Sequence, residues 1–185
     1  MTTENHKWLD APADLNGELE GVGGLPLRHA ARVLLINELG HVLVVKGHDE
    51  DNPSRSWWFT IGGGIEPGES PRSAAVRELL EETGIALDEN ALEGPVMERT
   101  SLFDFYVQPI VQHEMYYFAR VNGNHALDRS GWTENEVGFM DDLAWLSPTD
   151  LNESGLEVFP QGLATIVENL AKNGWDGTVI TVGLE

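Results

Sequence analysis

Residues 63–85 of the 185-residue chain read GGIEPGESPRSAAVRELLEETGI and combine a glycine-rich loop with a helix whose two ends can be recognised. Ser70 suits the N-cap of that helix, and Pro71 suits its first position, where the missing proline N–H costs nothing. Gly84 is the residue type that often follows the last turn of a helix. The sequence therefore predicts a helix that begins at Ser70-Pro71, runs to Thr83 and stops at Gly84.

The predicted helix divides into two faces when its residues are placed on a wheel at about 100° per residue. One face, which we expect to pack against the core, is made of four residues: Val76, Leu79, Leu80 and Thr83. Glu78, Glu81 and Glu82 fall within an arc of roughly 100° on the other side. Spacings of three and four residues place these carboxylates side by side.

Three neighbouring carboxylates near the end of a helix are unfavourable unless something offsets their charge. Like charges at this spacing cost roughly 0.2–0.5 kcal/mol per pair, and the helix dipole disfavours negative charge at the C-terminus. A solvated helix face is one interpretation, and a bound divalent cation, which reverses both penalties, is the other. Because the chain has no Cys and no clustered His, the glutamate oxygens indicate Mg²⁺ or Mn²⁺ rather than zinc.

The longer pattern of Gly63, Glu69 and the run from Arg77 to Ile85 resembles the Nudix box of the MutT-related hydrolases at every defining position. Nine specified positions would recur by chance in well below about one in a million windows. Ile61 departs from the family, in which many relatives carry proline, and this affects loop stiffness more than chemistry. The resemblance implies an α+β fold of the Nudix type, with a mixed β-sheet sandwiched between helices. It also implies hydrolysis of a nucleoside diphosphate linked to another moiety.

The resemblance carries metal-binding roles onto residues of this chain. Glu78 and Glu82, one helical turn apart, match the ligand positions of the family, and Glu81 matches a position that binds the same or a second metal. Glu69 lies in the loop before the helix, and we expect it to complete or orient the metal cluster. Gly63 is expected to let that loop pass close to the metal.

Catalysis in the resembled family requires a general base as well as the metal. The metal binds phosphate oxygens and lowers the pKa of the attacking water, and a carboxylate then takes the proton. The expected catalytic set includes Glu78, Glu81 and Arg77, with Arg77 holding the glutamates by charge-assisted hydrogen bonds. The position of the base varies within the family, so four candidates stay open: Glu81 in the box, and Glu114, Glu134 and Glu136 after it.

Substrate contacts are expected from aromatic and basic residues outside the box. The aromatic candidates for stacking on a base are Trp57, Phe103, Phe105 and Tyr106, although aromatics in strands more often belong to a core. The basic candidates for phosphate contacts are Lys46, Arg28, Arg55 and Arg99, and basic residues are scarce in this chain. Our expected substrate-binding set is Lys46, Arg28, Trp57 and Arg99.

The rest of the chain reads mainly as strands. Ala30–Ile36 and His41–Lys46 flank a turn at residues 37–40 and predict a hairpin. Three further strands are predicted at Pro95–Phe105, Ile110–Val121 and Leu143–Leu146, and a closing helix at Gln161–Lys172, ended by Asn173-Gly174. We expect residues 1–25 to form a mobile acidic arm and residues 26–185 to form a single Nudix-type domain that includes the closing helix.

The charge balance narrows the range of partners. Eleven basic against 31 acidic side chains give a net charge of −20, which repels polymeric nucleic acid and the anionic surface of a membrane. A small anionic nucleotide can still be the substrate of so acidic a chain if a bound cation offsets the negative electrostatic field of the protein. The sequence shows no signal peptide and no membrane-spanning run, and the chain has no Cys for disulfides, so we expect a cytoplasmic protein.

Two functions from different classes fit these observations. The first is a metal-dependent pyrophosphohydrolase that acts on a nucleoside triphosphate, ADP-ribose or a nucleotide sugar. The second is a Nudix-fold module that senses a nucleotide without cleaving it, against which the complete glutamate set argues. A homodimer stays open, because relatives of the resembled family are often dimers.

Overall fold

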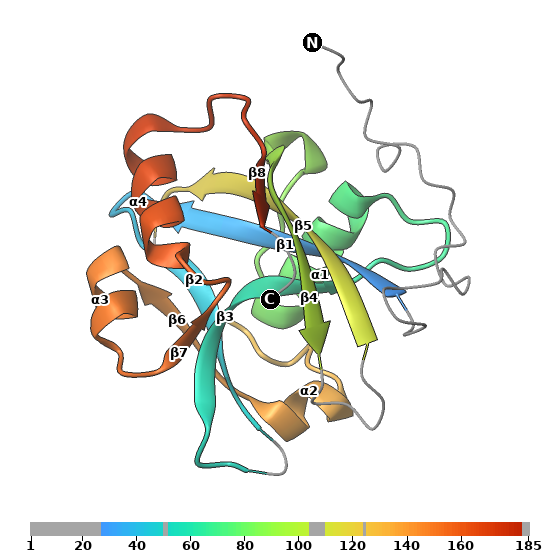
Figure 1. Ribbon diagram of the computed structural model, residues 1–185. Coiled ribbons are helices and arrows are strands. Elements are labelled where there is room, and N and C mark those ends of the chain that lie inside the picture. Colours follow the sequence, from blue (N-terminus) through green and yellow to red (C-terminus); the bar gives the residue numbers. More distant parts are fainter. Residues whose placement is uncertain (1–26, 50–51, 104–109, 124, 183–185) are drawn as a thin grey trace.

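The computed structural model describes residues 27–49, 52–103, 110–123 and 125–182, whose arrangement is shown in Figure 1. The expected arm, residues 1–25, lies outside the described residues, as do Phe105 and Tyr106. The strands are β1 (Leu27–Asn37), β2 (Val42–His48), β3 (Ser56–Gly64), β4 (Glu93–Phe103), β5 (Ile110–Val121), β6 (Met140–Leu146), β7 (Glu157–Phe159) and β8 (Ile180–Val182). The helices are α1 (Pro71–Thr83), α2 (Glu134–Phe139), α3 (Pro148–Glu153) and α4 (Leu163–Asn173), with a 3-10 turn η2 (Glu89–Ala91).

The strands form a mixed sheet in the order β6-β2-β3-β1-β5-β4-β8, and β7 pairs with β3 outside this order. The pairs β1–β5, β3–β7 and β4–β8 are parallel, and the pairs β1–β3, β2–β3, β2–β6 and β4–β5 are antiparallel. Helix α1 packs on one side of the sheet, whereas α3 and α4 pack on the other (Figure 1). The predicted α+β fold, a mixed sheet between helices, is therefore confirmed.

The predicted hairpin exists, but its two strands separate soon after the turn. The Gly40 N–H donates to the Asn37 carbonyl oxygen at 2.9 Å, which closes the turn. Between β1 and β2 the register contains a single pair, Ile36 with Val42, because β3 pairs with β1 at residues 30–33 and with β2 at residues 44–48. β1 then pairs along its whole length with β5. The glycine run at the start of the box, residues 62–64, is thus held in the middle of the sheet.

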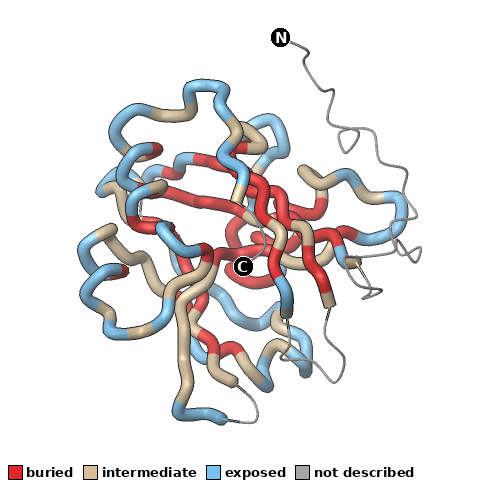
Figure 2. Tube along the Cα trace, viewed as in Figure 1, coloured by how far each residue is buried: buried red, intermediate tan, exposed pale blue. Residues whose placement is uncertain are grey.

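Two apolar layers cover the two faces of the sheet, and Figure 2 shows the central strands as the most buried part of the molecule. Ala31, Val33 and Leu35 of β1 belong to the layer under α1, and Leu34 and Ile36 belong to the layer under α4. Burial on both faces explains why the chain is continuously apolar in this strand rather than alternating. Among the described residues, no helix is long and apolar enough to cross a membrane.

Helix α1 has the predicted ends and part of the predicted buried face, since Leu79 and Thr83 are buried and Val76 packs against the core. The Ser70 side chain accepts a hydrogen bond from the Ser73 N–H, and the Gly84 N–H donates to the Leu80 carbonyl oxygen. Leu80, expected in the core, is 50% exposed, whereas Glu78 and Glu82, expected on the outer face, are 8% and 3% exposed. The wheel assigned carboxylates to solvent, which is the general rule for unpaired charges. Buried glutamates on a sheet-facing helix side are the first structural indication of a site.

The strand β3, the turn η2 and four short elements, α2, α3, β7 and β8, were not predicted. Two of them carry a readable signal, because Thr133 with Glu136 and Ser147 with Asp150 form capping boxes at the starts of α2 and α3. The closing helix α4 runs from Leu163 to Asn173 rather than from Gln161 to Lys172, and Gly174 follows its last turn, as predicted.

Candidate metal centre

The carboxylates of the box are arranged around one guanidinium, that of Arg77 on α1. Its Nε and Nη2 donate to the two oxygens of Glu69 at 2.8 and 2.9 Å. Its Nη1 donates to Glu78 Oε1 at 2.8 Å and to Glu81 Oε2 at 2.9 Å. Nη2 also donates to the Gly64 carbonyl oxygen at 2.9 Å. Arg77 therefore ties the loop before α1 to the glutamates of the helix, in the arrangement expected of a residue that orients them.

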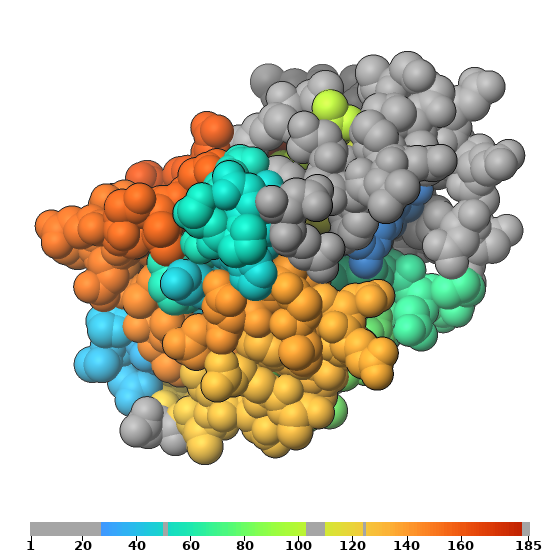
Figure 3. Space-filling model, turned by 90° about the horizontal axis from the view of Figure 1, so that it is seen from below, coloured from blue at the N-terminus to red at the C-terminus, as the bar shows by residue number. Residues whose placement is uncertain are grey.

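Three carboxylates from two helices converge next to this arginine. Glu78 and Glu82 of α1 and Glu136 of α2 each offer one oxygen, and these oxygens lie within 4.8 Å of one another. We refer to Glu78, Glu82 and Glu136 as the carboxylate cluster. In Figure 3, the gold and orange residues around α2 occupy the centre and lower part of the face viewed from below. Of the candidate bases that follow the box, the structure thus brings Glu136 to the glutamates of α1, while Glu134 is exposed on the same helix.

Glu82 is the most deeply buried member of the carboxylate cluster. Its Oε2 accepts a hydrogen bond from the Gly62 N–H at 2.9 Å. Burial raises the pKa of Glu82 to about 8, against the opposing effects of the Gly62 N–H and Arg32. Burial also raises the pKa of Glu78, with Arg77 opposing it. Carboxylates that are desolvated beside one another favour protonation or a bound cation, because either removes the cost of confining like charges.

The segment before α2 closes the C-terminal end of α1. The Asp128 N–H donates to the Thr83 carbonyl oxygen at 2.9 Å, and the Trp132 indole Nε1 donates to the Glu82 carbonyl oxygen at 2.8 Å. A Cβ on Gly131 would lie 2.2 Å from the Glu81 carbonyl oxygen, so the two backbones touch. These contacts satisfy carbonyl groups that a helix end leaves without intrahelical partners. They also fix the start of α2 relative to the box helix.

Glu136 is oriented by the capping box of its own helix. Its Oε2 accepts hydrogen bonds from the Thr133 N–H at 2.6 Å and from the Thr133 hydroxyl at 2.7 Å. A carboxylate whose one oxygen is fixed by two donors holds its plane, so the second oxygen has a defined direction. The sequence contained this signal as a Thr-x-x-Glu motif, but only the fold shows that it faces Glu78 and Glu82.

The donor set of the carboxylate cluster fits a hard divalent cation. All the grouped atoms are carboxylate oxygens, which Mg²⁺ and Mn²⁺ prefer. Two oxygens bound about 2.1 Å from one Mg²⁺ ion are at most about 4.2 Å apart. The three cluster oxygens lie within 4.8 Å of one another, so small side-chain rotations would bring them to the distances that one ion requires. A Cβ on Gly63 would lie 2.6 Å from the Glu78 carboxylate, so glycine is needed for this approach. Glu69 accepts hydrogen bonds from Arg77 with both of its oxygens and is therefore connected to the carboxylate cluster through Arg77.

Glu114, a third candidate base, belongs to a separate buried network. Its Oε1 accepts from Arg32 Nε and Gln112 Nε2, both at 2.9 Å, and its Oε2 accepts from the Tyr116 hydroxyl at 3.0 Å. Arg99 Nε lies 3.4 Å from the same Oε2. Glu114 is 1% exposed and both of its oxygens are engaged, so the geometry favours the other candidate bases. Arg99, expected at the substrate, is 5% exposed and paired with this carboxylate.

The other expected substrate residues are spread over the sheet. Arg28 is exposed, and its guanidinium lies beside Gly64, where a Cβ would be 2.7 Å from Nη2. Lys46 is half-buried on β2, between β3 and β6. Trp57 is half-buried on β3, with the guanidinium of Arg55 5.6 Å from the centre of its ring. Within the described part of the chain, Arg28 is thus the expected substrate residue whose contacts reach the box loop.

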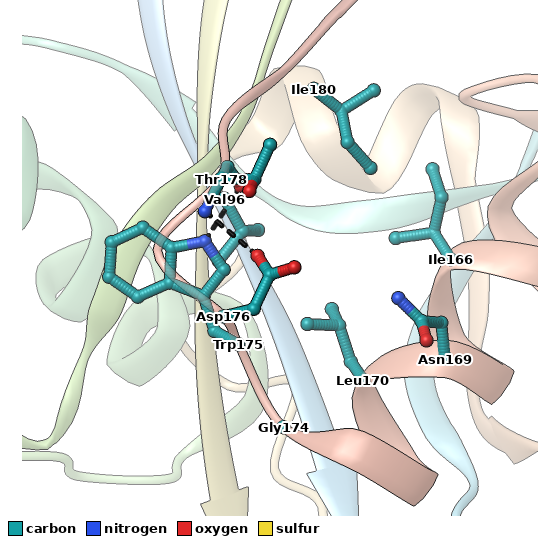
Figure 4. Close-up of a pocket in the computed structure, with 9 residues that line it drawn as sticks. All are labelled: Val96, Ile166, Asn169, Leu170, Gly174, Trp175, Asp176, Thr178 and Ile180. Carbon is teal, nitrogen blue, oxygen red and sulfur yellow. Dashed lines mark hydrogen bonds between the residues drawn. The ribbon is translucent and has the colours of Figure 1, made fainter.

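A pocket lies away from the carboxylate cluster, between the end of α4 and strands β4 and β8 (Figure 4). Leu170 and Val96 contribute apolar walls, and Asp176 and Thr178 contribute polar ones. The Trp175 indole donates to the Thr178 carbonyl oxygen at 2.8 Å, which folds the segment after α4 back on itself. None of the residues that line this pocket belongs to the box, so it is a feature of the C-terminal packing.

The raised pKa of Glu82 predicts how the stability of the metal-free protein depends on pH. A folded-state pKa of about 8, above the ordinary value of 4.5, means that the folded state binds the proton more tightly. The corresponding stabilisation is present below pH 4.5 and is lost as the pH rises through 8. In EDTA, Glu82→Gln should therefore melt several degrees above the wild type at pH 8 and close to it at pH 4.5, because about 1 kcal/mol shifts Tm by roughly 2–4 °C. Melting curves at the two values check this, and an equal difference at both would contradict it.

The chain has relatives among characterised protein families. It is 46% identical over 66 residues to an RNA pyrophosphohydrolase of Roseobacter denitrificans, which covers 36% of this chain and 39% of that protein. It is 33% identical over 119 residues to a putative 8-oxo-dGTP diphosphatase of Bacillus subtilis, which covers 64% of this chain and 65% of that protein. The chain thus spans about two fifths of the length of the first relative and less than two thirds of the second.

Solved structures support the fold. The MutT protein from Methanosarcina mazei Go1 superposes with a TM-score of 0.54 at 18% identity, over 78% of this chain and 93% of that one. The family model for the NUDIX domain matches residues 26–169, which confirms the resemblance of the box. Since that match covers most of the 185 residues, the chain belongs to the NUDIX domain family.

Proposed function

We propose that the chain is a metal-dependent hydrolase that cleaves a phosphoanhydride bond of a nucleoside diphosphate linked to another moiety. The observation that carries the proposal is the carboxylate cluster, in which Glu78, Glu82 and Glu136 bring three oxygens within 4.8 Å beside an oriented arginine. Membership of the family and the names of the relatives support it, because they are a pyrophosphohydrolase and a diphosphatase.

In this proposal, Glu78, Glu82 and Glu136 hold Mg²⁺ or Mn²⁺. When bound, the cation would coordinate phosphate oxygens, offset their developing charge and lower the pKa of the attacking water. Arg77 keeps Glu78 and Glu81 in place, and Glu69 in turn fixes Arg77 by two hydrogen bonds. Gly63 leaves room for the Glu78 carboxylate.

The attacking water needs a proton acceptor that lies beside the carboxylate cluster and is exposed to solvent. Glu81 follows Glu78 by less than one turn, its side chain is 50% exposed, and Arg77 Nη1 holds its Oε2 at 2.9 Å. We assign it the role of proton acceptor, because an exposed carboxylate can pass the proton on to solvent. Arg28, exposed next to Gly64, is assigned to the substrate phosphates.

The substrate is proposed to be a small nucleotide. With a net charge of −20, the chain repels a polyanion over distances at which a small ligand interacts only with the local site. The names of the relatives include an RNA pyrophosphohydrolase as well as a putative 8-oxo-dGTP diphosphatase. An RNA oligonucleotide with a 5′-triphosphate is therefore the polymeric substrate to compare with the small ones.

The proposal is tested by measuring phosphate and pyrophosphate release in Mg²⁺ across a nucleotide panel. The panel holds canonical nucleoside triphosphates, 8-oxo-dGTP, ADP-ribose, nucleotide sugars, dinucleoside polyphosphates and the 5′-triphosphorylated RNA. We expect one small-nucleotide class to be turned over with kcat/KM of about 10⁴ M⁻¹s⁻¹ or more. Turnover of the RNA alone would contradict the small-substrate assignment. Tight binding of nucleotides without any turnover would instead support the alternative, a nucleotide-sensing module.

Replacing Glu136 tests whether α2 contributes to the metal centre. Glu136→Gln should raise the Kd for Mn²⁺ and lower kcat by about a hundredfold, since it removes one anionic oxygen from the cluster. Glutamine also serves in a capping box, so α2 should keep its start. Glu134→Gln, on the same helix but exposed, is the matched control and should retain wild-type Mn²⁺ affinity and turnover. Equal effects of the two substitutions would remove Glu136 from the site.

A further inference from the structure

A buried ion pair on β1 and β5 contacts the backbone that touches Glu82. Arg32 of β1 donates from Nε to Glu114 Oε1 at 2.9 Å, and the two side chains are 13% and 2% exposed. Glu114 accepts further hydrogen bonds from Gln112 and Tyr116. The carboxylate is therefore fixed from several directions, and so is the guanidinium that it holds.

The free end of this guanidinium clamps strand β3. Arg32 Nη1 donates to the Thr60 carbonyl oxygen at 3.2 Å and also to the Gly62 carbonyl oxygen. These two carbonyls lie on either side of the Gly62 N–H along the chain. That N–H is the group that donates to Glu82 Oε2 at 2.9 Å. Arg32 Nη1 thus holds the peptide groups before and after the one whose N–H, that of Gly62, donates to Glu82.

The backbone at Gly62 has an unusual conformation next to this contact. Its φ is +128°, a conformation that residues other than glycine rarely adopt, and a Cβ there would lie 2.2 Å from the Ala31 carbonyl oxygen. Glycine carries the largest conformational freedom of any residue, and it is followed by Gly63 and Gly64. The register with β1 pairs these glycines with Ala30, Ala31 and Arg32, but the Gly62 N–H itself donates to Glu82 rather than to the neighbouring strand. The Arg32 clamp is the side-chain contact that the structure shows on both flanking carbonyls.

We propose that Arg32 is a positioning residue for the metal centre, which keeps the Gly62 N–H directed at Glu82, and that Glu114 holds Arg32 in place. The proposal deepens the proposed function. Only the effect of Arg32 on turnover rests on that function, whereas its effect on the Gly62 N–H and on Mn²⁺ binding can be measured without a substrate. Arg32 acts through the Gly62 backbone and not on the substrate. It also gives Glu114 a role, since this residue lies too deep in its network to serve as the base.

Arg32→Lys tests the clamp with the smallest change of charge. A lysine can keep a positive charge near Glu114, but a single ammonium cannot donate in the directions of both Nε and Nη1. The matched control is Arg120→Lys, because Arg120 also donates to two backbone carbonyls, those of Leu170 and Ala171, on the α4 side. Two quantities are compared in both variants: the ¹H–¹⁵N resonance of the Gly62 amide in metal-free protein, and the Kd for Mn²⁺.

In Arg32→Lys, we expect the Gly62 amide proton to move upfield as its hydrogen bond to the carboxylate weakens, and the Kd for Mn²⁺ to rise about tenfold or more. Arg120→Lys should leave both values at wild type. An unmoved Gly62 resonance with an unchanged Kd in a folded Arg32→Lys protein would overturn the proposal. If the wild type hydrolyses no nucleotide but Arg32→Lys binds Mn²⁺ more weakly than the wild type, the result would support the clamp and contradict the proposed function.

If Arg32→Lys does not fold, the wild-type protein still decides the question. A clamped guanidinium has Nη1 protons that are resolved from the Nη2 protons and exchange slowly with water. Separate, slowly exchanging Nη1 resonances for Arg32 are expected. A single averaged resonance, from free rotation about the Nε–Cζ bond, would show that Arg32 does not hold the carbonyls and would overturn the proposal.

Discussion

Replacement of Glu82 by glutamine is expected to lower kcat/KM about a thousandfold or more while the protein remains folded. The substitution removes the anionic oxygen that lies deepest in the carboxylate cluster, and a loss of this size corresponds to about 4 kcal/mol of transition-state stabilisation. Glutamine keeps the side-chain length and an oxygen that can accept the Gly62 N–H. The fold should therefore survive, because the change exchanges a buried charge for a buried neutral group.

The measurement compares steady-state kinetics of the wild type, Glu82→Gln and a control. Glu168→Gln on α4 is a suitable control, because Glu168 is exposed and pairs with Lys172 on the side of the sheet opposite to α1. It should retain wild-type kinetics. Turnover by Glu82→Gln within a few-fold of wild type, with its fold verified by circular dichroism, would refute the assignment of Glu82 to the metal centre.

Removal of divalent cations is expected to reduce turnover of the wild type more than a hundredfold. The carboxylates of the cluster would then face the phosphates as negative charges, or as a protonated pair, and either state lacks the cation that neutralises developing charge. The test is an assay in EDTA, followed by addition of excess Mg²⁺ or Mn²⁺. Activity should return with either ion in the wild type.

Glu82→Gln provides the control for the chelation experiment. If the added ions act at the carboxylate cluster, they should restore the wild type and leave the variant inactive. Full activity of the wild type in EDTA would exclude the metal-dependent mechanism. Equal restoration of both proteins would mean that the ion acts elsewhere, for example on the substrate alone.

The ends of the box helix could be predicted from the sequence because they depend on local chemistry. Ser70, Pro71 and Gly84 cap this helix wherever it lies in a fold, and the structure shows all three in the expected positions. Five strands, β1, β2, β4, β5 and β6, were predicted for a similar reason, since apolar runs between turn residues are local features, whereas the central strand β3 was not predicted. Their pairing was harder, and the insertion of β3 between β1 and β2 depends on the whole sheet.

Hydropathy predicted only part of the buried face of α1: Leu79 and Thr83 are buried as expected, but Glu78 and Glu82 are buried as well. Leu80 is exposed and Glu82 is buried, because the helix turns Glu82 toward the central strands β3 and β1, where Gly62 supplies an N–H and Arg32 a nearby positive charge. An apolar scale assigns the two residues the other way round. The resemblance to the Nudix box was the signal that pointed to Glu82 as a ligand regardless of hydropathy.

The long-range parts of the candidate site depend on tertiary structure. Glu136 is 54 residues beyond Glu82 in the numbering, and its Thr-x-x-Glu motif predicts a helix start but not a contact with the box. Arg32 was absent from our candidates, because a basic residue in an apolar strand gives no indication of what it contacts. The strand register places it opposite Gly62, and only that pairing reveals the contact.

The location of the bound ion tests the account most directly. Crystals grown with Mn²⁺ should show an anomalous density peak about 2.1 Å from oxygens of Glu78, Glu82 and Glu136, with Arg77 still bound to Glu69. The same crystals of Glu82→Gln should lose the peak or show it weakened. A wild-type structure in millimolar Mn²⁺ with no ion among these three carboxylates, or with the ion bound at another site, would contradict the proposed metal centre.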